Sequence, residues 1–415
     1  MFKNIIQKGF SRRQFVNLTA GSAAGIGFSQ MVPSVFAATG HATLPKSNDR
    51  ILVVVQLSGG NDGLNTVVPY ADDHYYKNRF SLAIEKPAAR KINDQIGFHP
   101  SLNGFSSLLE SNQLAVVQGV GYPNPNRSHF ESMDLWHTAH LNEERIPQGW
   151  LGRFLENGEM AKSLDVPAIH FGSEKQPLAL AAEKSAFPSI RSIEQFRLKL
   201  GRNKALRKLI ESNVAEKRKE DDELLSFVQA TANSAFKAGA RVEEVLKKKT
   251  TAETYPSTQL GRKLQTVSKM ISAEMPTAVY YVTLDGFDTH ANQGEAHAGL
   301  LSQLGDAVST FMNDMTKQGN DKRVLLLSFS EFGRRVRQNA SQGTDHGTAG
   351  PVFLAGGGVK SGPHGKHPRL DDLVDGDLQF HTDYRQVYAT ILEKWFATDS
   401  KSILGGQYKS LDLFS

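Results

Sequence analysis

Short apolar runs that stop abruptly at glycine or polar residues constrain the fold of this chain most strongly. Residues 51–57 read ILVVVQL, apolar except for Gln56, and they lead directly into Ser-Gly-Gly-Asn-Asp-Gly. Comparable runs occur at 114–120, 279–284, 324–329 and 352–355. A run rich in β-branched residues, without regular polar alternation, is typical of a strand that is buried on both faces. The sequence therefore predicts the buried strands of an internal sheet.

Helical patterns separate these runs. Helical spacing or a helix-start signature is found at 102–109, 128–131, 300–315 and 383–396. Strands that alternate with helices predict an α/β fold with a doubly wound, mostly parallel sheet. We place this domain in two parts of the chain, at 51–181 and 276–415.

The stretch between those two parts has a different character. Residues 182–275 are rich in Lys and Glu and poor in glycine, and their apolar residues recur at helical spacing. This pattern indicates amphipathic helices whose charged faces are solvated. We predict that residues 182–275 form a helical insertion into the α/β domain.

The N-terminus has the plan of an export signal. Residues 1–37 contain four basic residues and no acidic residue, and Arg12-Arg13 precedes a mildly apolar stretch that ends in Val-Phe-Ala. A paired arginine in this position marks the twin-arginine route, although a basic, poorly ordered N-terminus is the alternative. We predict a signal at 1–37, a linker at 38–50, and a periplasmic or secreted protein. Its partner would be the twin-arginine export machinery, and no stable membrane span would remain after signal removal.

Charge and cysteine content narrow the classes of function. The chain has 48 basic and 43 acidic residues, a net charge of +5. Without the four basic residues of the signal, the balance is 44 to 43, or +1. We therefore expect no nucleic-acid partner, because such proteins carry a concentrated basic surface. The chain has no cysteine, which excludes disulfides, thiolate metal ligands and a cysteine nucleophile.

Polar clusters follow the predicted strands. They are Asn61-Asp62, Ser128-His129, Asp288 with His290, Glu331, and Asp345-His346. Ligands bind in open α/β sheets outside the carboxyl ends of the strands, so these side chains are candidates for one site. Carboxylates and imidazoles suit Zn, Mn, Mg or Ca. We predict a divalent metal of undetermined identity, with Asp62, Asp288, His290, Glu331, Asp345 and His346 as candidate ligands.

Each cluster also has a structural interpretation. Asp62 fits a turn, and Ser128 fits a helix cap with Glu131 as the partner of a capping box. Glu331 could pair with a neighbouring arginine, and Asp345 could simply fix its loop through hydrogen bonds. His297 is expected at the surface.

Five motifs together resemble one protein family. They are Gly-Gly-Asn-Asp-Gly-Leu-Asn at 59–65, Pro-Asn-Arg-Ser-His-Phe at 125–130, Gly-Phe-Asp-Thr-His at 286–290, Ser-Glu-Phe-Gly-Arg at 330–334 and Thr-Asp-His-Gly-Thr-Ala-Gly-Pro at 344–351. They resemble a bacterial twin-arginine-exported family known only as a domain of unknown function. That family looks like a distant branch of the alkaline phosphatase and sulfatase superfamily. Members of the superfamily hydrolyse phosphate or sulfate esters with metal-activated nucleophiles.

The resemblance implies an alkaline phosphatase-like fold, a nucleophile and a set of metal ligands. Ser128 stands where the superfamily places its nucleophile, after a strand and at a helix start. The implied ligands are Asp62, Asp288, His290, Glu331 and His346. Phe332 stands where a paired histidine ligand would be, so a single-metal, remodelled or inactive site is also compatible with the resemblance.

Two classes of function follow. The first is an exported metal-dependent hydrolase in which Ser128 attacks a phosphate or sulfate ester and His129 assists proton transfer. Asn61, Arg127 and Arg334 are its candidate residues for binding an anionic small molecule or glycan. The second is a non-catalytic envelope protein that binds an anionic glycan or another exported protein in the same pocket.

Overall fold

The structure is a computed structural model that describes residues 49–141, 146–158, 164, 166–191 and 253–415. The predicted export signal at 1–37, most of the predicted linker at 38–50, and 192–252 of the predicted insertion lie outside the described residues. Within the described part of the chain, no helix is long and apolar enough to cross a membrane.

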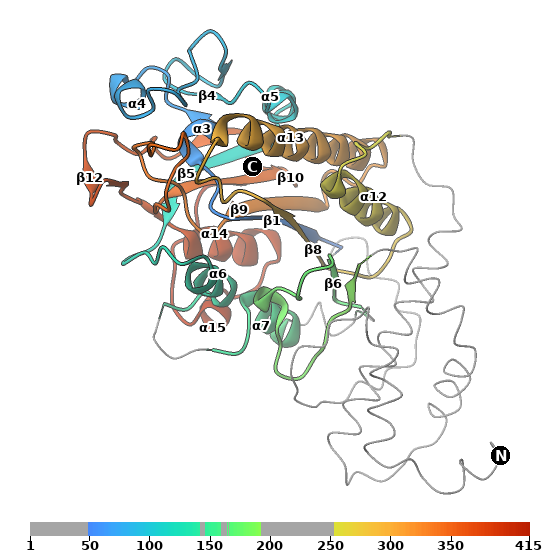
Figure 1. The fold of residues 1–415 in the computed structure, drawn as a ribbon. Helices are drawn as coiled ribbons and strands as arrows, with labels where there is room; N and C mark the ends of the chain where they lie inside the picture. The colour runs from blue at the N-terminus through green and yellow to red at the C-terminus, as the bar shows by residue number, and fades with distance from the viewer. Residues whose placement is uncertain (1–48, 142–145, 159–163, 165, 192–252) are drawn as a thin grey trace, which may run out of the picture.

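A nine-stranded sheet forms the centre of the molecule, in the order β11-β5-β10-β9-β1-β8-β6-β7, with β14 also paired to β5 (Figure 1). Its strands are β1 (Ile51–Ser58), β5 (Leu114–Gly121), β6 (Ala168–Phe171), β7 (Ser189–Ile190), β8 (Val279–Asp285), β9 (Val324–Ser330), β10 (Gly350–Gly356), β11 (Gly362–His364) and β14 (Thr382–Asp383). The five apolar runs became β1, β5, β8, β9 and β10, which confirms those predicted strands. The predicted α/β fold with a mostly parallel sheet is also confirmed.

The strand directions bring several loops to one edge of the sheet. β1 is parallel to β8 and β9, and β8 is parallel to β6, whereas β10 is antiparallel to both β9 and β5. The carboxyl ends of β5, β9, β1, β8 and β6 therefore share an edge. Because β10 runs the other way, its first residue, Gly350, lies at that same edge. The loops that follow β1, β8 and β9 and the loop that precedes β10 consequently meet.

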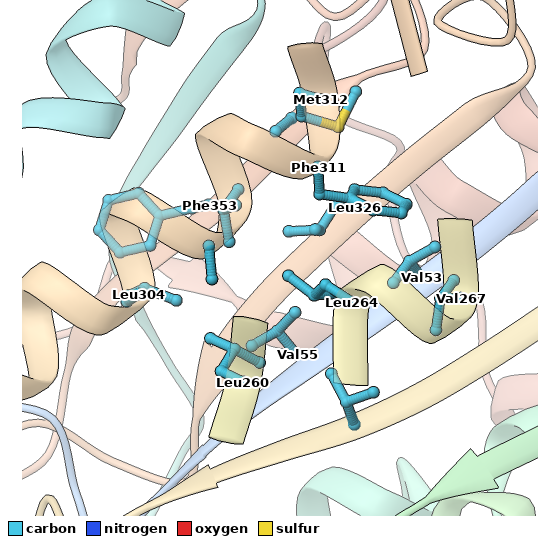
Figure 2. Close-up of a cluster of buried hydrophobic side chains, with 14 of the residues drawn as sticks. Val53, Val55, Leu260, Leu264, Val267, Leu304, Phe311, Met312, Leu326 and Phe353 are labelled. Atoms are coloured by element: carbon cyan, nitrogen blue, oxygen red, sulfur yellow. The ribbon is translucent and has the colours of Figure 1, made fainter. Parts of the chain in front are cut away.

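Helices cover both faces of the sheet. Alternate residues of β1 enter the two halves of the core, with Val53 and Val55 on one side and Leu52 and Val54 on the other. One face packs under three helices, α5 (Asn103–Glu110), α12 (Gln259–Ser272) and α13 (Gln293–Lys317). The other face packs under α6 (His129–Thr138), α7 (Trp150–Asn157), α14 (Tyr384–Thr390) and α15 (Lys401–Leu404) (Figure 1). Figure 2 shows the first half, where β1, β9 and β10 meet α12 and α13. Burial on both faces explains why these strands read as nearly continuous apolar runs.

The remaining elements complete the α/β domain. The helices are α3 (Gly63–Thr66), α4 (Asp73–Asn78), α5 (Asn103–Glu110), α6 (His129–Thr138), α7 (Trp150–Asn157), α12 (Gln259–Ser272), α13 (Gln293–Lys317), α14 (Tyr384–Thr390), a π-helix (Ile391–Trp395), α15 (Lys401–Leu404) and a 3₁₀ turn (Leu178–Leu180). Two small sheets pair β2 (Val67–Val68) with β4 (Gly97–Phe98) and β3 (Arg90–Lys91), and β12 (Leu373–Val374) with β13 (Asp377–Leu378).

The described ends of the predicted insertion join the main domain. β7 pairs with β6 and is the outermost strand of the large sheet on that side. In α12, Leu260, Leu264 and Val267 are fully buried in the core. Their spacing of four and three residues places them on one face of the helix, which is the face that packs on the sheet.

Candidate functional site

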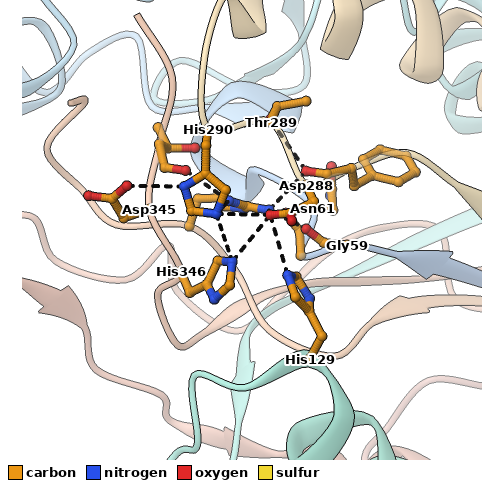
Figure 3. A network of polar contacts seen from close by, with 12 residues as sticks. Gly59, Asn61, His129, Asp288, Thr289, His290, Asp345 and His346 are labelled. Carbon is orange, nitrogen blue, oxygen red and sulfur yellow. Dashed lines mark hydrogen bonds and ion pairs between the residues drawn. The ribbon is translucent and has the colours of Figure 1, made fainter. Parts of the chain in front are cut away.

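Four side chains meet at the edge of the sheet where the strand-end loops converge, and we call them the donor cluster: His129, Asp288, His290 and His346 (Figure 3). Asp288 and His290 lie in the loop after β8, and His346 lies in the loop before β10. His129 is the first residue of α6. Three segments distant in sequence therefore supply the cluster.

Three imidazoles point at one carboxylate oxygen. The Nε2 atoms of His290, His346 and His129 lie 3.0, 3.2 and 3.3 Å from Oδ1 of Asp288. The Nε2 atoms of His290 and His346 are 2.8 Å apart. Two nitrogens at this distance are joined by a hydrogen bond when one of them carries a proton, and both are placed to bind one cation when neither does.

Glu331 contacts the Nδ1 side of the His129 ring, opposite the nitrogen that faces Asp288. Its Oε1 lies 2.7 Å from Nδ1 of His129 and accepts a hydrogen bond from the Gly59 amide at 2.9 Å, while Oε2 accepts one from the Ser330 hydroxyl. Glu331 is only 1% exposed and is outside the donor cluster. The structure thus places Glu331, predicted as a metal ligand, one residue further from the centre of the donor cluster, where its carboxylate contacts His129.

The other two histidines are fixed in the same way. Nδ1 of His290 lies 3.1 Å from Oδ1 of Asp345, and Nδ1 of His346 lies 2.7 Å from the backbone oxygen of Arg127. Asp345, also predicted as a ligand, therefore orients His290 instead. When Nδ1 donates to an oxygen, the proton is on Nδ1 and the lone pair of Nε2 is free, which is the tautomer that a metal requires.

Asp288 is kept ionised within this group. Burial alone would raise its pKa, but the hydrogen bond and the positive charge of Arg334 oppose that effect and help to hold the pKa well below its usual range. Its carboxylate is therefore charged at neutral pH and can serve as a ligand.

Arg334 is a structural cation rather than a free one. Its Nε donates to the Gly60 carbonyl at 2.7 Å, and Nη1 donates to the Thr344 carbonyl at 2.8 Å. Nη2 donates to Oδ1 of Asp288 at 2.7 Å and also contacts the carbonyls of Gly59 and Phe287. The side chain is fully buried and its nitrogens donate to protein oxygens, whereas a role in substrate binding was predicted for Arg334.

Asp62 is also removed from the donor cluster. Its carboxylate forms a buried ion pair with Arg79, with Oδ2 2.5 Å from Nη1 and Oδ1 2.9 Å from Nη2, and it accepts a further bond from Gln293. Burial raises the pKa of Asp62, but Arg79 outweighs this and lowers it to about 2. The predicted metal ligand is therefore a structural anion, and the sequence offered no sign of Arg79 as its partner.

Asn61 has a structural role as well. Its Oδ1 accepts hydrogen bonds from the Thr66 hydroxyl at 2.9 Å and from Nε2 of His297 at 3.0 Å, and the residue is 2% exposed. The side-chain oxygen of Asn61, which was predicted to bind substrate, is therefore engaged in two hydrogen bonds within the protein.

His297 is 2% exposed, so the expectation that it lies at the surface is wrong. Burial lowers its pKa to about 4, which keeps the ring neutral.

Ser128 occupies the N-cap position of α6 without capping it. Its side chain makes no capping hydrogen bond, so the predicted capping box with Glu131 is wrong. Its backbone amide donates instead to Oδ1 of Asn126 at 2.7 Å. The half-buried hydroxyl of Ser128 therefore stands beside His129 in the chain without being committed to the helix.

Phe332 forms an apolar wall of the cluster. Its ring centre lies 4.9 Å from that of His129 and 5.0 Å from that of His346. Gly60, at φ +74°, lets the chain pass close by, since a Cβ there would come within 2.4 Å of the phenyl ring. The phenyl ring fills this position but has no nitrogen that could bind a metal. A histidine at position 332 would have supplied one.

The donor cluster fits a divalent metal. One nitrogen or oxygen from each of His129, Asp288 and His346 lies within 4.8 Å of the others. Nε2 of His129 is buried and has no hydrogen-bond partner among the described residues. Imidazole nitrogens with a carboxylate oxygen are ligands for Zn²⁺ and related ions, and His290 lies close enough to Asp288 and His346 to be a fourth.

Comparison with solved structures gives distant similarities. A protein of the alkaline phosphatase superfamily from Vibrio parahaemolyticus has a TM-score of 0.40 and 8% identity, over 96% of this chain and 78% of that one. The PsFucS1 sulfatase from Pseudoalteromonas sp. has a TM-score of 0.39 and 9% identity, over 88% and 71%. The zinc complex of the periplasmic domain of EcEptC from Escherichia coli has a TM-score of 0.35 and 10% identity, over 75% and 74%.

Sequence comparison assigns the family. No curated protein matches the chain. The family described as "Protein of unknown function (DUF1501)" matches residues 49–407, which include all five motifs and every residue of the donor cluster. The chain belongs to this DUF1501 family.

Proposed function

We propose that this protein is a metal-dependent hydrolase of phosphate or sulfate esters, with a divalent metal bound by the donor cluster. One observation carries the proposal: three imidazole Nε2 atoms converge on Oδ1 of Asp288. Each of these rings is held at Nδ1 by an oxygen, the arrangement by which proteins orient metal-binding histidines.

The surrounding residues suit an anionic substrate. A bound metal would stabilise negative charge and activate an oxygen nucleophile. Ser128 is the candidate nucleophile, and it is the N-cap residue of α6, where the helix dipole favours an anion. Arg334 neutralises part of the charge of Asp288, so the site does not repel an ester. His129 was predicted to assist proton transfer. We assign it to metal binding instead, because its Nε2 faces Oδ1 of Asp288.

Metal content and turnover test the proposal directly. We expect purified full-length protein to contain about one metal per chain by elemental analysis and to hydrolyse an aryl phosphate or an aryl sulfate. His346→Ala should lose the metal and the activity, and Ser128→Ala should lose the activity alone. The control is His74→Ala, an exposed histidine on α4 that pairs with Asp72 outside the cluster. Protein that binds no Zn, Mn, Mg or Ca would overturn the proposal.

Phe332 supports the second candidate, a non-catalytic protein that binds an anionic glycan or another exported protein. A phenyl ring against His129 and His346 supplies surface for contact but no ligand. Stoichiometric metal without turnover of either ester class, together with binding of an anionic glycan, would favour this alternative.

We also propose export by the twin-arginine route, on the basis of Arg12 and Arg13. Replacing both by lysine in the full chain should keep the uncleaved protein in the cytoplasm, as seen by fractionation and immunoblotting. Lys3→Arg with Lys8→Arg is the control, because it keeps the charge and leaves the pair intact. Equal export of both variants would contradict this route.

A further inference from the structure

Two arginines share one buried carboxylate beside the donor cluster. Asp377 lies at the start of β13 and is 1% exposed. Its Oδ2 accepts a hydrogen bond from Nε of Arg127 at 2.9 Å and also contacts Nη2 of that residue. Nε of Arg335 lies 3.7 Å from Oδ1 of Asp377. The carboxylate thus sits between two guanidinium groups that come from different loops.

Two guanidinium groups contact the Asp377 carboxylate directly. Asp375 and Asp345 also act electrostatically on Asp377 and Arg335, but neither forms an ion pair with Arg127 or Arg335 among the described residues. The side chains of Arg127 and Arg335 are 41% and 37% exposed, which leaves part of each side chain accessible to solvent. Among the described residues, Arg335 makes this one long ion pair and no side-chain hydrogen bond, so its donors are available. Arg127 binds only Oδ2 of Asp377, and the buried Oδ1 has no hydrogen-bond partner among the described residues. Arg335 reaches that oxygen only at 3.7 Å, so its guanidinium is not committed to Asp377 by a hydrogen bond.

The backbone fixes these arginines next to the donor cluster. The carbonyl of Arg127 accepts the Nδ1 bond of His346, and the Arg335 amide donates to the Asp345 carbonyl at 3.0 Å. Both arginines are therefore one hydrogen bond away from residues that hold or form the cluster. A group bound to them would lie alongside whatever occupies the metal site.

A tight hairpin supports the same group. β12 and β13 pair Val374 with Asp377 across a two-residue turn in which Asp375 and Gly376 have φ values of +53° and +81°. Positive φ at both central residues is the geometry of a type I′ turn, which is rigid and matches the twist of the strands. A Cβ on Gly376 would be 3.8 Å from Nη1 of Arg335, so this guanidinium lies over the turn.

We propose that Arg127 and Arg335 form a second anion-binding subsite, which takes a further negatively charged group of the substrate. The substrate class would then be a multiply anionic ester, of which a sulfated oligosaccharide is the example we would test. This inference rests on the proposed function for the group that binds at the metal, but the arginine subsite can be measured without turnover. Arginine suits the task because its planar fork binds sulfate or phosphate through two hydrogen bonds.

The test is the affinity of full-length protein for a heparin-derived tetrasaccharide, measured by calorimetry against the same sugar after desulfation. We expect binding that requires sulfate. Arg335→Gln should weaken it about tenfold, the effect of losing a charge-assisted hydrogen bond. Arg335→Lys should lie between Arg335→Gln and the unaltered protein, because it keeps the charge but loses the fork. Arg337→Gln is the matched control: it removes the same charge from an exposed residue two positions further on, and should change the affinity less than twofold.

Two results would overturn the subsite. One is equal weakening by Arg335→Gln and Arg337→Gln, which would show only an effect of net charge. The other is binding that does not depend on sulfate. Each variant is first checked by circular dichroism and thermal unfolding, and Arg335→Lys preserves the test if Arg335→Gln does not fold.

Failure of the subsite and failure of the proposed function are distinguishable. If the hydrolase proposal fails, the protein contains no metal or hydrolyses neither ester, but Arg335→Gln still weakens sulfate-dependent binding. If the subsite fails, metal and turnover remain while Arg335→Gln and Arg337→Gln behave alike. Repeating the calorimetry with His346→Ala separates the contribution of the metal from that of the arginines.

Discussion

The Glu331 carboxylate lies behind the donor cluster, with its two oxygens held by the Gly59 amide and the Ser330 hydroxyl. We expect Glu331→Gln to weaken metal binding about 10- to 100-fold, as is typical when the partner of a metal-binding histidine is changed. The reason is that an amide presents either a weaker acceptor or a donor to His129. Zinc titration with a competing chelator measures the effect, with Glu110→Gln, an exposed residue of α5, as control. Unchanged affinity in Glu331→Gln would refute this role.

Asp62 stabilises the fold through Arg79, and both side chains are fully buried. Asp62→Asn should lower the free energy of unfolding by about 3–5 kcal/mol, because it leaves a buried guanidinium without its counter-ion. Urea unfolding at pH 7 measures this change. A loss below about 1 kcal/mol would mean that Arg79 finds another partner.

The same ion pair gives a pH dependence with a defined sign. The pKa of Asp62 falls from 3.8 to about 2 on folding, so its contribution is fully present above pH 4 and is lost as the pH falls through 2. Urea unfolding between pH 5 and pH 2 should therefore show a steeper decline for the unaltered protein than for Asp62→Asn. Parallel curves would contradict the assignment.

At the scale of the element, α5 and α13 pack through a close approach at Gly104. A Cβ there would lie 2.0 Å from the backbone oxygen of Gly305. Gly104→Ala should destabilise the protein by about 1–3 kcal/mol, because the two helices must move apart. Gly299→Ala, on α13 with open space around it, should be neutral or stabilise by up to about 1 kcal/mol, since alanine favours a helix. Thermal unfolding of the two variants measures the difference in their stability. Destabilisation of both would show a general effect of replacing glycine by alanine rather than an effect of the close approach at Gly104.

The elements also show how far the sequence alone reaches. The apolar runs predicted β1, β5, β8, β9 and β10, because a strand buried on both faces has a composition that no exposed segment tolerates. β6, at Ala168–Phe171, was not predicted, since a run of four residues, one of them a histidine, carries too little pattern to separate a strand from other buried chain. The helices at 102–109 and 383–396 were predicted from their spacing and are found as α5 and as α14 with the π-helix.

At the scale of the whole molecule, the scaffold and the candidate site are separable. Two large apolar clusters lie on the two faces of the sheet, and the donor cluster lies at its edge. Removal of metal with a chelator should therefore leave the secondary structure intact and lower Tm. Readdition at 100 times Kd should restore about 2.7 kcal/mol of stability. Circular dichroism and calorimetry measure both quantities, and His346→Ala should show no response to metal. Collapse of the fold on chelation would contradict the separation.

The sequence by itself determined the five central strands of the sheet, helices on its faces, the edge at which polar residues gather, and the family. Its signals are local, because periodicity and strand-end motifs are written in neighbouring residues. Only the tertiary structure decided which of the gathered residues face one another. It turned Asp62 toward Arg79, placed Glu331 and Asp345 behind the histidines, and buried Arg334 among carbonyls. Those partners are up to 274 residues apart, and no local pattern encodes which buried group a distant side chain will reach.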